Sequence, residues 1–194
     1  MSCIADFYDG CKVGYEGCEG YRKSTDLQKF ANCIRELEDM GCIDRQRTVF
    51  ADLGCADGRV NVLMSYFVKK SIGIEIDHDI LDEYPVRKAE LIGRLKTAGL
   101  APPPDNIAVF HGSSLKDETF RDIFSETGVQ YQDIDLFYTY ITLHDLFAEK
   151  IAREAKQGAL YLVYGFNKIL PQYEGLDLVV ADVASQGISA LYVK

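Results

Sequence analysis

The chain lacks any apolar run that approaches the ~18 to 20 residues needed to span a bilayer. Residues 1–8, MSCIADFY, contain neither a basic region nor a long apolar stretch, so a secretory signal is not expected. We therefore expect a cytoplasmic protein without a membrane partner.

Basic side chains are scarce relative to acidic ones, with 21 lysines and arginines against 30 aspartates and glutamates. The net charge of −9 argues against a nucleic-acid partner held by the field of the whole protein, because phosphate affinity comes largely from Lys and Arg. It suits a basic protein or a cationic small molecule. A small basic patch on one face is compatible with the same count.

Disordered, collagen-like and coiled-coil compositions are absent as well. Of the 194 residues, 47% are apolar and 26% are charged, which is close to the globular average. This length fits one domain, or one domain with an extension, and it can bury a core without metal or disulfide staples.

The six cysteines form no CxxC pair and no zinc-ribbon spacing. Five of them lie within the first 42 residues. We interpret them as reduced, mostly buried or incidental thiols. A metal or redox role for Cys3, Cys11 and Cys18 is the alternative.

Two regions are expected along the chain. Residues 1–24 are rich in Gly, Tyr and Cys and show no clear period, which predicts an irregular arm. Thr25 is then expected to cap an amphipathic helix that ends at Gly41. We assign residues 1–46 to an N-terminal arm and capping helix, and residues 47–194 to one domain.

From residue 48 onward, short apolar strands alternate with helices, which predicts a parallel sheet with helices on both faces. The last two strand-like runs flank Ser185-Gln186-Gly187 and indicate an antiparallel hairpin. The expected fold is therefore α/β, with a seven-stranded, mostly parallel sheet. The expected strands are residues 48–53, 71–76, 106–110, 134–140, 159–164, 177–183 and 188–193, and the expected helices are 58–70, 85–98, 116–126 and 144–156.

The first expected strand ends in a glycine-rich turn, DLGCADG at residues 52–58. Its two glycines permit a tight turn with close approach of the backbone to a ligand, at the positive N-terminus of a helix. A nicotinamide fingerprint, G-x-G-x-x-G, fails at two positions, where Ala56 and Arg59 stand. The pattern D-x-G-x-[GA]-x-G fits, and it places Asp52 near the ligand, where it favours a positive group.

A second acid lies at the tip of the second expected strand. Glu75 follows Gly54 by 21 residues, a spacing at which an acid can hold both hydroxyls of a ribose. A nucleoside with a cationic tail fits both acids. S-adenosyl-L-methionine, with a sulfonium, an ammonium and a ribose, is such a ligand. Incidental acids beside a generic strand–turn–helix are the alternative.

The turn, Glu75 and the terminal hairpin together resemble the class I S-adenosylmethionine-dependent methyltransferases, which have a seven-stranded, Rossmann-like sheet. The resemblance covers about residues 48–194. It implies S-adenosyl-L-methionine as cofactor, and adenine contact by the loop at residues 111–115, where many members carry an aspartate and this chain has Ser113. The cofactor-binding residues it implies are Asp52, Gly54, Cys55, Asp57, Gly58, Glu75, Ile76 and Ser113.

The tip of the fourth expected strand lacks the N-P-P-Y or D-P-P-Y of many base-N methyltransferases. The stretch IDLFYTYITLHDLFAEKIAREAKQGALYLVYGF instead resembles small archaeal-type protein-lysine methyltransferases, which are distantly similar to the telomeric-silencing type. This resemblance implies a protein partner with an accessible lysine. Tyr138 and Tyr140 are the catalytic candidates that would shape the acceptor site, with Tyr164 and Phe166 nearby, because an aromatic slot lowers the pKa of an amine. Core packing is the alternative for each ring.

Two other functions are open on the same residues: a methyltransferase for a small metabolite or RNA, and a non-catalytic module that binds S-adenosylmethionine. His78, His111 and His144 follow three of the strands, and we expect cap, adenine-edge or surface positions for them, with a general base as the alternative. Their spacing is not a metal signature, and no metal is expected. The sequence does not indicate an oligomeric state.

Overall fold

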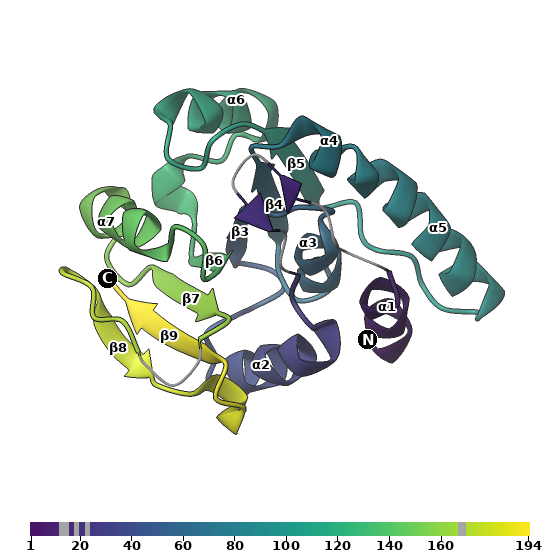
Figure 1. The fold of residues 1–194 in the computed structure, drawn as a ribbon, viewed down its shortest axis with the longest axis horizontal. Helices are drawn as coiled ribbons and strands as arrows, with labels where there is room; N and C mark the ends of the chain where they lie inside the picture. Colours follow the sequence, from purple (N-terminus) through teal and green to yellow (C-terminus); the bar gives the residue numbers. More distant parts are fainter. Residues whose placement is uncertain (12–15, 18–19, 22–23, 167–169) are drawn as a thin grey trace.

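The structure is a computed structural model, and it describes residues 1–11, 16–17, 20–21, 24–166 and 170–194. Its centre is a mixed β-sheet (Figure 1). The strands of this sheet are β3 (Val49–Leu53), β4 (Lys70–Glu75), β5 (Ile107–His111), β6 (Leu136–Tyr140), β7 (Leu160–Tyr164), β8 (Asp177–Val180) and β9 (Ser189–Val193).

The sheet has seven strands in the order β5-β4-β3-β6-β7-β9-β8. The first five in this order are parallel to their neighbours, and β9 is antiparallel to both β7 and β8. This confirms the expected fold, including the C-terminal antiparallel hairpin. The order reverses between β3 and β6, and such a switch point is where ligands bind in open α/β sheets.

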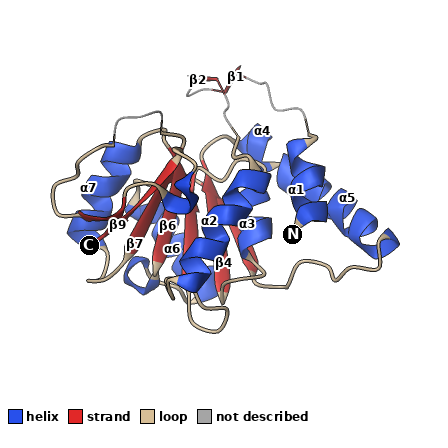
Figure 2. Cartoon of the chain, turned by 90° about the horizontal axis from the view of Figure 1, so that it is seen from below, coloured by secondary structure: helices blue, strands red, loops and turns tan. Residues whose placement is uncertain are grey.

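Helices cover both faces of the sheet, as Figures 1 and 2 show. A second, two-stranded sheet, β1 (Glu16–Gly17) with β2 (Gly20–Tyr21), stands outside the main body (Figure 2). One face carries α1 (Ser2–Asp9), α2 (Leu27–Asp39), α3 (Arg59–Met64) and α5 (Glu83–Thr97), the other carries α6 (Asp117–Thr127) and α7 (His144–Glu154), and the shorter elements are α4 (His78–Leu81), η1 (Tyr131–Asp133) and η2 (Val183–Ser185).

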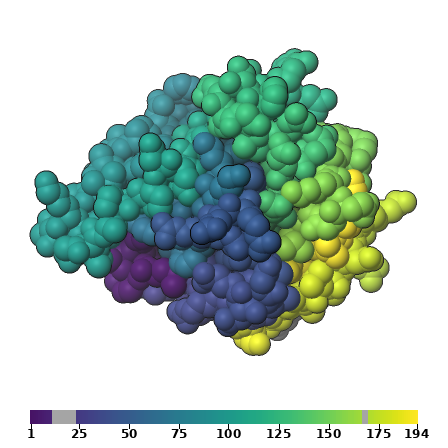
Figure 3. Space-filling view, turned by 180° about the vertical axis from the view of Figure 1, so that it is seen from behind, coloured from purple at the N-terminus to yellow at the C-terminus, as the bar shows by residue number. Residues whose placement is uncertain are grey.

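The first residues form the helix α1, and not the irregular arm expected for residues 1–24. Ile4, Phe7 and Tyr8 are each at most 4% exposed, and their i, i+3, i+4 spacing presents one apolar face to the core. Seen from behind, α1 lies against α2 and the region of α5 (Figure 3). The prediction was wrong because two helical turns are too short for a period to stand out. Other residues of the expected arm, 12–15, 18–19 and 22–23, lie outside the described residues.

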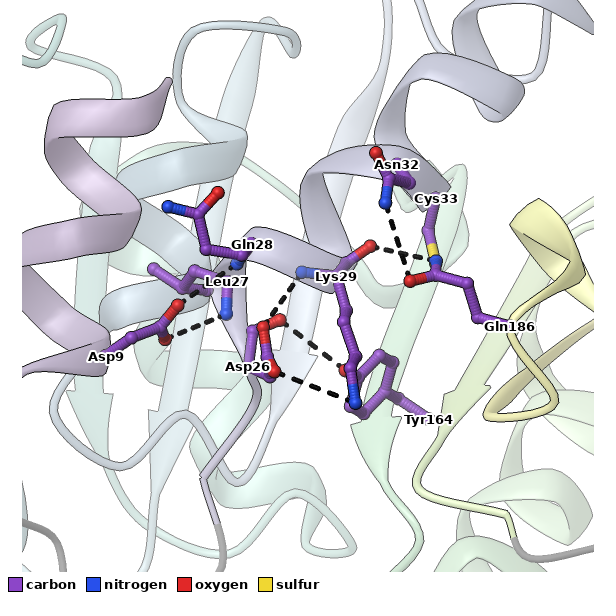
Figure 4. Close-up of polar contacts among 9 residues, drawn as sticks. All are labelled: Asp9, Asp26, Leu27, Gln28, Lys29, Asn32, Cys33, Tyr164 and Gln186. Atoms are coloured by element: carbon purple, nitrogen blue, oxygen red, sulfur yellow. Dashed lines mark hydrogen bonds and ion pairs between the residues drawn. The ribbon is translucent and has the colours of Figure 1, made fainter.

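Asp26, and not Thr25, caps the N-terminus of α2. The Asp26 carboxylate accepts a hydrogen bond from Lys29 N at 2.9 Å. Asp9, at the end of α1, accepts bonds from the first two N–H groups of α2 at 2.9 and 3.1 Å (Figure 4). Thr25 instead shares a hydrogen bond with Tyr138, 2.5 Å between the two hydroxyl oxygens.

The far side of α2 is tied to the C-terminal hairpin. The Gln186 side chain donates to the Lys29 carbonyl at 3.0 Å (Figure 4), and Ala184 N donates to the Glu36 carboxylate at 2.5 Å. Buried side chains of α1 and α2 belong to the same apolar cluster as those of β3, β6 and β9. Residues 1–46 and 47–194 therefore share one hydrophobic core.

Two expected elements are shorter than their sequence patterns indicated. The helix expected over residues 58–70 ends at Met64, because Phe67 N bonds back to the Met64 carbonyl in a tighter turn. The strand expected over residues 177–183 ends at Val180, and η2 follows it.

Candidate functional site

The turn between β3 and α3 has three residues in left-handed conformations. Gly54, Ala56 and Gly58 have φ of 99°, 49° and 70°. A Cβ at Gly58 would lie 2.4 Å from the Tyr84 ring, so only glycine fits there. A Cβ at Gly54 would meet nothing within 4 Å, so the backbone at this residue borders open space where a ligand can approach.

Glu75, at the end of β4, closes this turn. One carboxylate oxygen accepts from Ala56 N at 2.9 Å, and the other accepts from Asp77 N at 2.9 Å. Glu75 is 8% exposed, and each of its oxygens keeps a second lone pair. The structure therefore positions this carboxylate rigidly at the tip of β4, beside the turn.

Asp52 lies in the middle of the sheet, where β3 pairs with Gly73 of β4 and Tyr138 of β6. It is 2% exposed. Burial raises the pKa of its carboxyl well above the usual range, and the neighbouring Glu75 and Asp57 raise it further. Within the part of the chain that the structure describes, no lysine, arginine or histidine forms an ion pair with Asp52. A cation at this position would be stabilised by the ionised carboxylate.

Asp57 and Cys55, two of the expected cofactor residues, have side chains packed inside the protein. Asp57 forms a two-point ion pair with Arg59, at 2.9 and 2.8 Å, and the Arg59 guanidinium lies 5.6 Å from the centre of the Tyr8 ring. Cys55 is 3% exposed, and a Cβ at Gly73 would lie 2.8 Å from its sulfur. Both side chains pack beneath the turn, so only the backbone of these two residues is left to contact a ligand.

Ile76 and Ser113 lie beyond Glu75 at the edge of the sheet. Ile76 is 44% exposed, which leaves an apolar surface free directly after the acid. Gly112 N donates to the Glu75 carbonyl at 2.8 Å and so brings the loop that contains Ser113 next to β4. The Ser113 hydroxyl accepts from Leu115 N at 3.3 Å within its own loop. This arrangement suits a flat apolar ring system.

Tyr138 is a core residue. Its ring is 1% exposed and packs against Phe30 of α2 at 5.1 Å between centroids. Its hydroxyl bonds Thr25, and burial raises its pKa well above the usual range, so it stays protonated. In this conformation the ring offers no surface to a methyl acceptor, and the core alternative fits it.

Tyr140 differs from Tyr138, because its ring is only partly buried. It lies 5.7 Å from the buried Tyr164 ring, and a Cβ at Gly165 would come within 2.7 Å of it. Gly165 has φ of 100°, so a glycine is required by both the backbone and the ring. Of the two catalytic candidates, Tyr140 is the one placed at the strand tip with an accessible face.

Phe166 faces the opposite side of the sheet, in the cluster with α7. There it lies 6.2 Å from the His144 ring, which also contacts Tyr173. The position of Tyr173 had no signal in the sequence, because the loop that carries it shows no period. His78 and His111 pack together at 5.2 Å, next to Ile76.

The described residues offer neither a metal site nor a membrane span. No group of three or more His, Cys, Asp or Glu there could hold a metal ion. No helix among them combines the length and the apolar character that a membrane crossing requires. Cys3 and Cys11 are free thiols, and Cys18 lies outside the described residues.

No protein-family model and no curated protein matches this chain. Solved structures do match it. The rRNA methyltransferase aviRa from Streptomyces viridochromogenes shares 14% identity over 99% of this chain and 91% of its own, with a TM-score of 0.58. An RNA methyltransferase from Salinibacter ruber, in complex with S-adenosyl-L-homocysteine, shares 16% identity over 88% and 91%, with a TM-score of 0.51. A variant of MtNAS in complex with S-adenosylmethionine shares 12% identity over 89% and 68%, with a TM-score of 0.54. The chain therefore has the Rossmann-like, seven-stranded fold of the class I S-adenosylmethionine-dependent methyltransferases.

Proposed function

We propose that this protein is an S-adenosylmethionine-dependent methyltransferase. The observation that carries the proposal is the placement of Asp52 and Glu75 on neighbouring strands, on either side of a glycine turn with open space at Gly54. A buried carboxyl without a cationic partner among the described residues fits a ligand that brings its own positive charge. The fold neighbours that contain S-adenosylmethionine or S-adenosyl-L-homocysteine support the same ligand.

Different residues would bind different parts of that cofactor. Asp52 would neutralise its cationic end, and the free lone pairs of Glu75 would accept from the two ribose hydroxyls. Ile76 and the loop of Ser113 would enclose the adenine ring. The backbone at Gly54 and the N-terminus of α3 complete the cradle. When bound, the cofactor supplies an activated methyl group, and the protein accelerates transfer mainly by aligning the acceptor with it.

We further propose that the acceptor is the amine of a lysine on another protein. The net charge of −9 favours a basic partner over an anionic one. Tyr140 presents a partly exposed ring at the tip of β6, beside Tyr164, where it can exclude water from an amine and attract its cationic form.

RNA is the second candidate acceptor, because two of the fold neighbours are RNA methyltransferases. The charge balance of this chain opposes it. A small metabolite and a cofactor-binding module without catalysis are the further outcomes that a test must separate.

Label transfer separates these acceptors. Purified protein is incubated with tritiated S-adenosylmethionine and a cell extract, and label is read in the protein, RNA and small-molecule fractions. We expect label in protein, on lysine by mass spectrometry. Label only in RNA or metabolites would support a methyltransferase but contradict lysine as the acceptor. Cofactor binding by calorimetry without label in any fraction would instead indicate a binding module.

A further inference from the structure

His144 begins α7, directly after the loop that leaves the tip of β6. Leu143 before it has φ of 54°, a left-handed conformation that is strained for a residue with a side chain. Such strain persists only where surrounding contacts hold the backbone, and it clusters at functional sites. The strained turn carries the His144 ring at the same end of the sheet as Tyr140.

One nitrogen of the His144 ring is surrounded by oxygens. Nδ1 lies 2.7 Å from the Tyr173 hydroxyl and 2.6 Å from a carboxylate oxygen of Asp145. A carboxylate can only accept, so it favours a proton on Nδ1. Burial, and then nearby Tyr192 and Asp145, raise the pKa of the Tyr173 phenol, so it stays neutral and can accept from that proton. The lone pair of the neutral imidazole is then on Nε2.

Aromatic packing holds this arrangement in place. The Tyr173 ring stacks edge-on against Tyr192 of β9, with centroids 4.7 Å apart, and the Tyr192 hydroxyl donates to the Pro171 carbonyl at 2.9 Å. Tyr161 of β7 donates to the His144 carbonyl at 3.0 Å. The His144 side chain is 22% exposed, and no described residue bonds its Nε2.

The tyrosines of β6 and β7 are poor bases. Burial raises the pKa of Tyr138, Tyr140 and Tyr161, so all three are neutral phenols. The titratable groups packed against His144 are Asp145 on α7, Tyr161 on β7 and Tyr173 in the loop before β8. Asp145 is 73% exposed and faces Nδ1, so it acts on the imidazole and not on the acceptor.

We propose that His144 is the general base of the methyl transfer, and that Asp145 and Tyr173 are the positioning residues that keep its Nε2 unprotonated. This inference rests on the proposed function and names the group that prepares the acceptor. The acceptor ammonium gives one proton to His144 Nε2. The neutral amine then forms the N–C bond with its lone pair, while the C–S bond breaks and its electron pair stays on sulfur. The imidazolium returns the proton to water from its exposed edge.

The first test needs no acceptor. Nitrogen-15 correlation spectra of the histidine rings report which ring nitrogen carries the proton, and His144→Asn identifies the His144 signal among three histidines. We expect the Nδ1–H form in the wild type, and a shift toward Nε2–H in Asp145→Asn. An Nε2–H form in the wild type would overturn the proposal, because Tyr173 would then be the donor.

The second test follows label transfer to the protein fraction, with His144→Asn and Tyr173→Phe compared at several pH values. Removal of a general base lowers rates by about a hundredfold or more, and the residual rate of His144→Asn should keep rising with pH. Tyr173→Phe should lose less, because Asp145 still faces Nδ1. Cofactor affinity by calorimetry should match the wild type in both variants, which shows that they are folded.

A wild-type rate and pH profile in His144→Asn would contradict the base assignment while the methyltransferase stands. A wild-type protein that labels no protein would contradict the lysine acceptor, and with it this role of His144. The tautomer spectra would show separately whether the imidazole geometry is correct.

Discussion

The Tyr138 hydroxyl on β6 lies 2.5 Å from the Thr25 hydroxyl just before α2, although the two residues are 113 positions apart in the chain. Both side chains are at most 4% exposed. Tyr138 is also the register partner of Asp52. This one bond therefore ties the start of α2 to β6, the strand that pairs with β3 at Asp52.

Tyr138→Phe should destabilise the protein by about 1 kcal/mol, since it leaves the buried Thr25 hydroxyl without its partner. Denaturant unfolding measures the loss. Tyr138→Phe combined with Thr25→Val should recover part of it, because neither polar group is then left unpaired. Unchanged stability with lost methyl transfer would show instead that Tyr138 acts on the acceptor.

Glu75→Ala should weaken cofactor binding by roughly thirtyfold, or about 2 kcal/mol, through lost bonds to the ribose and to Ala56 N. Glu75→Gln keeps one acceptor oxygen, so its cofactor affinity should lie between those of the wild type and Glu75→Ala. Calorimetry measures affinity, and Glu90→Ala on the exposed side of α5 is the matched control. Unchanged affinity in Glu75→Ala would contradict the placement of the ribose.

Asp52→Asn should raise stability and lower cofactor affinity together. The folded-state pKa of Asp52 is raised above its unfolded value, so its favourable contribution is complete below the unfolded pKa and is lost as pH rises through the folded pKa. The variant cannot ionise, and its stability advantage should therefore grow with pH. Melting curves at about pH 5 and about pH 8 compare the two proteins. An advantage that shrinks as pH rises would refute the sign of this shift.

Gly165→Ala should displace the Tyr140 ring, because the new Cβ would come within 2.7 Å of it. We expect a raised KM for the protein acceptor with unchanged cofactor affinity. Gly158→Ala is the control, since its φ of 80° imposes similar backbone strain of about 1 kcal/mol and its Cβ meets nothing within 4 Å. Equal kinetics in the two variants would remove Tyr140 from the acceptor site.

Local signals in the sequence were sufficient to predict the main sheet and the glycine turn after β3. Three features carried the prediction: the glycines at 54 and 58, the acid at 75 and the terminal hairpin. Each can be recognised from a short stretch of sequence. The left-handed φ values of both glycines and the position of Glu75 at a strand end agree with that prediction.

The partner that each polar side chain takes could not be predicted in the same way. Thr25 has the chemistry of a helix cap, but the Tyr138 hydroxyl engages it and Asp26 takes the cap. Asp57 has the chemistry of a ligand contact, but Arg59 binds it internally. In each case a polar group had more than one possible partner, and only the packed structure decides between them.

The Asp9 carboxylate accepts a hydrogen bond from Leu27 N at 2.9 Å, so α1 is bound to the start of α2 by more than the chain that connects them. The apolar face of α1 is also buried in the core. A proteolytic cut between these two residues should therefore not release the N-terminal peptide under native conditions. The cleaved protein should elute from gel filtration as a single species, and its two fragments should separate only in denaturant.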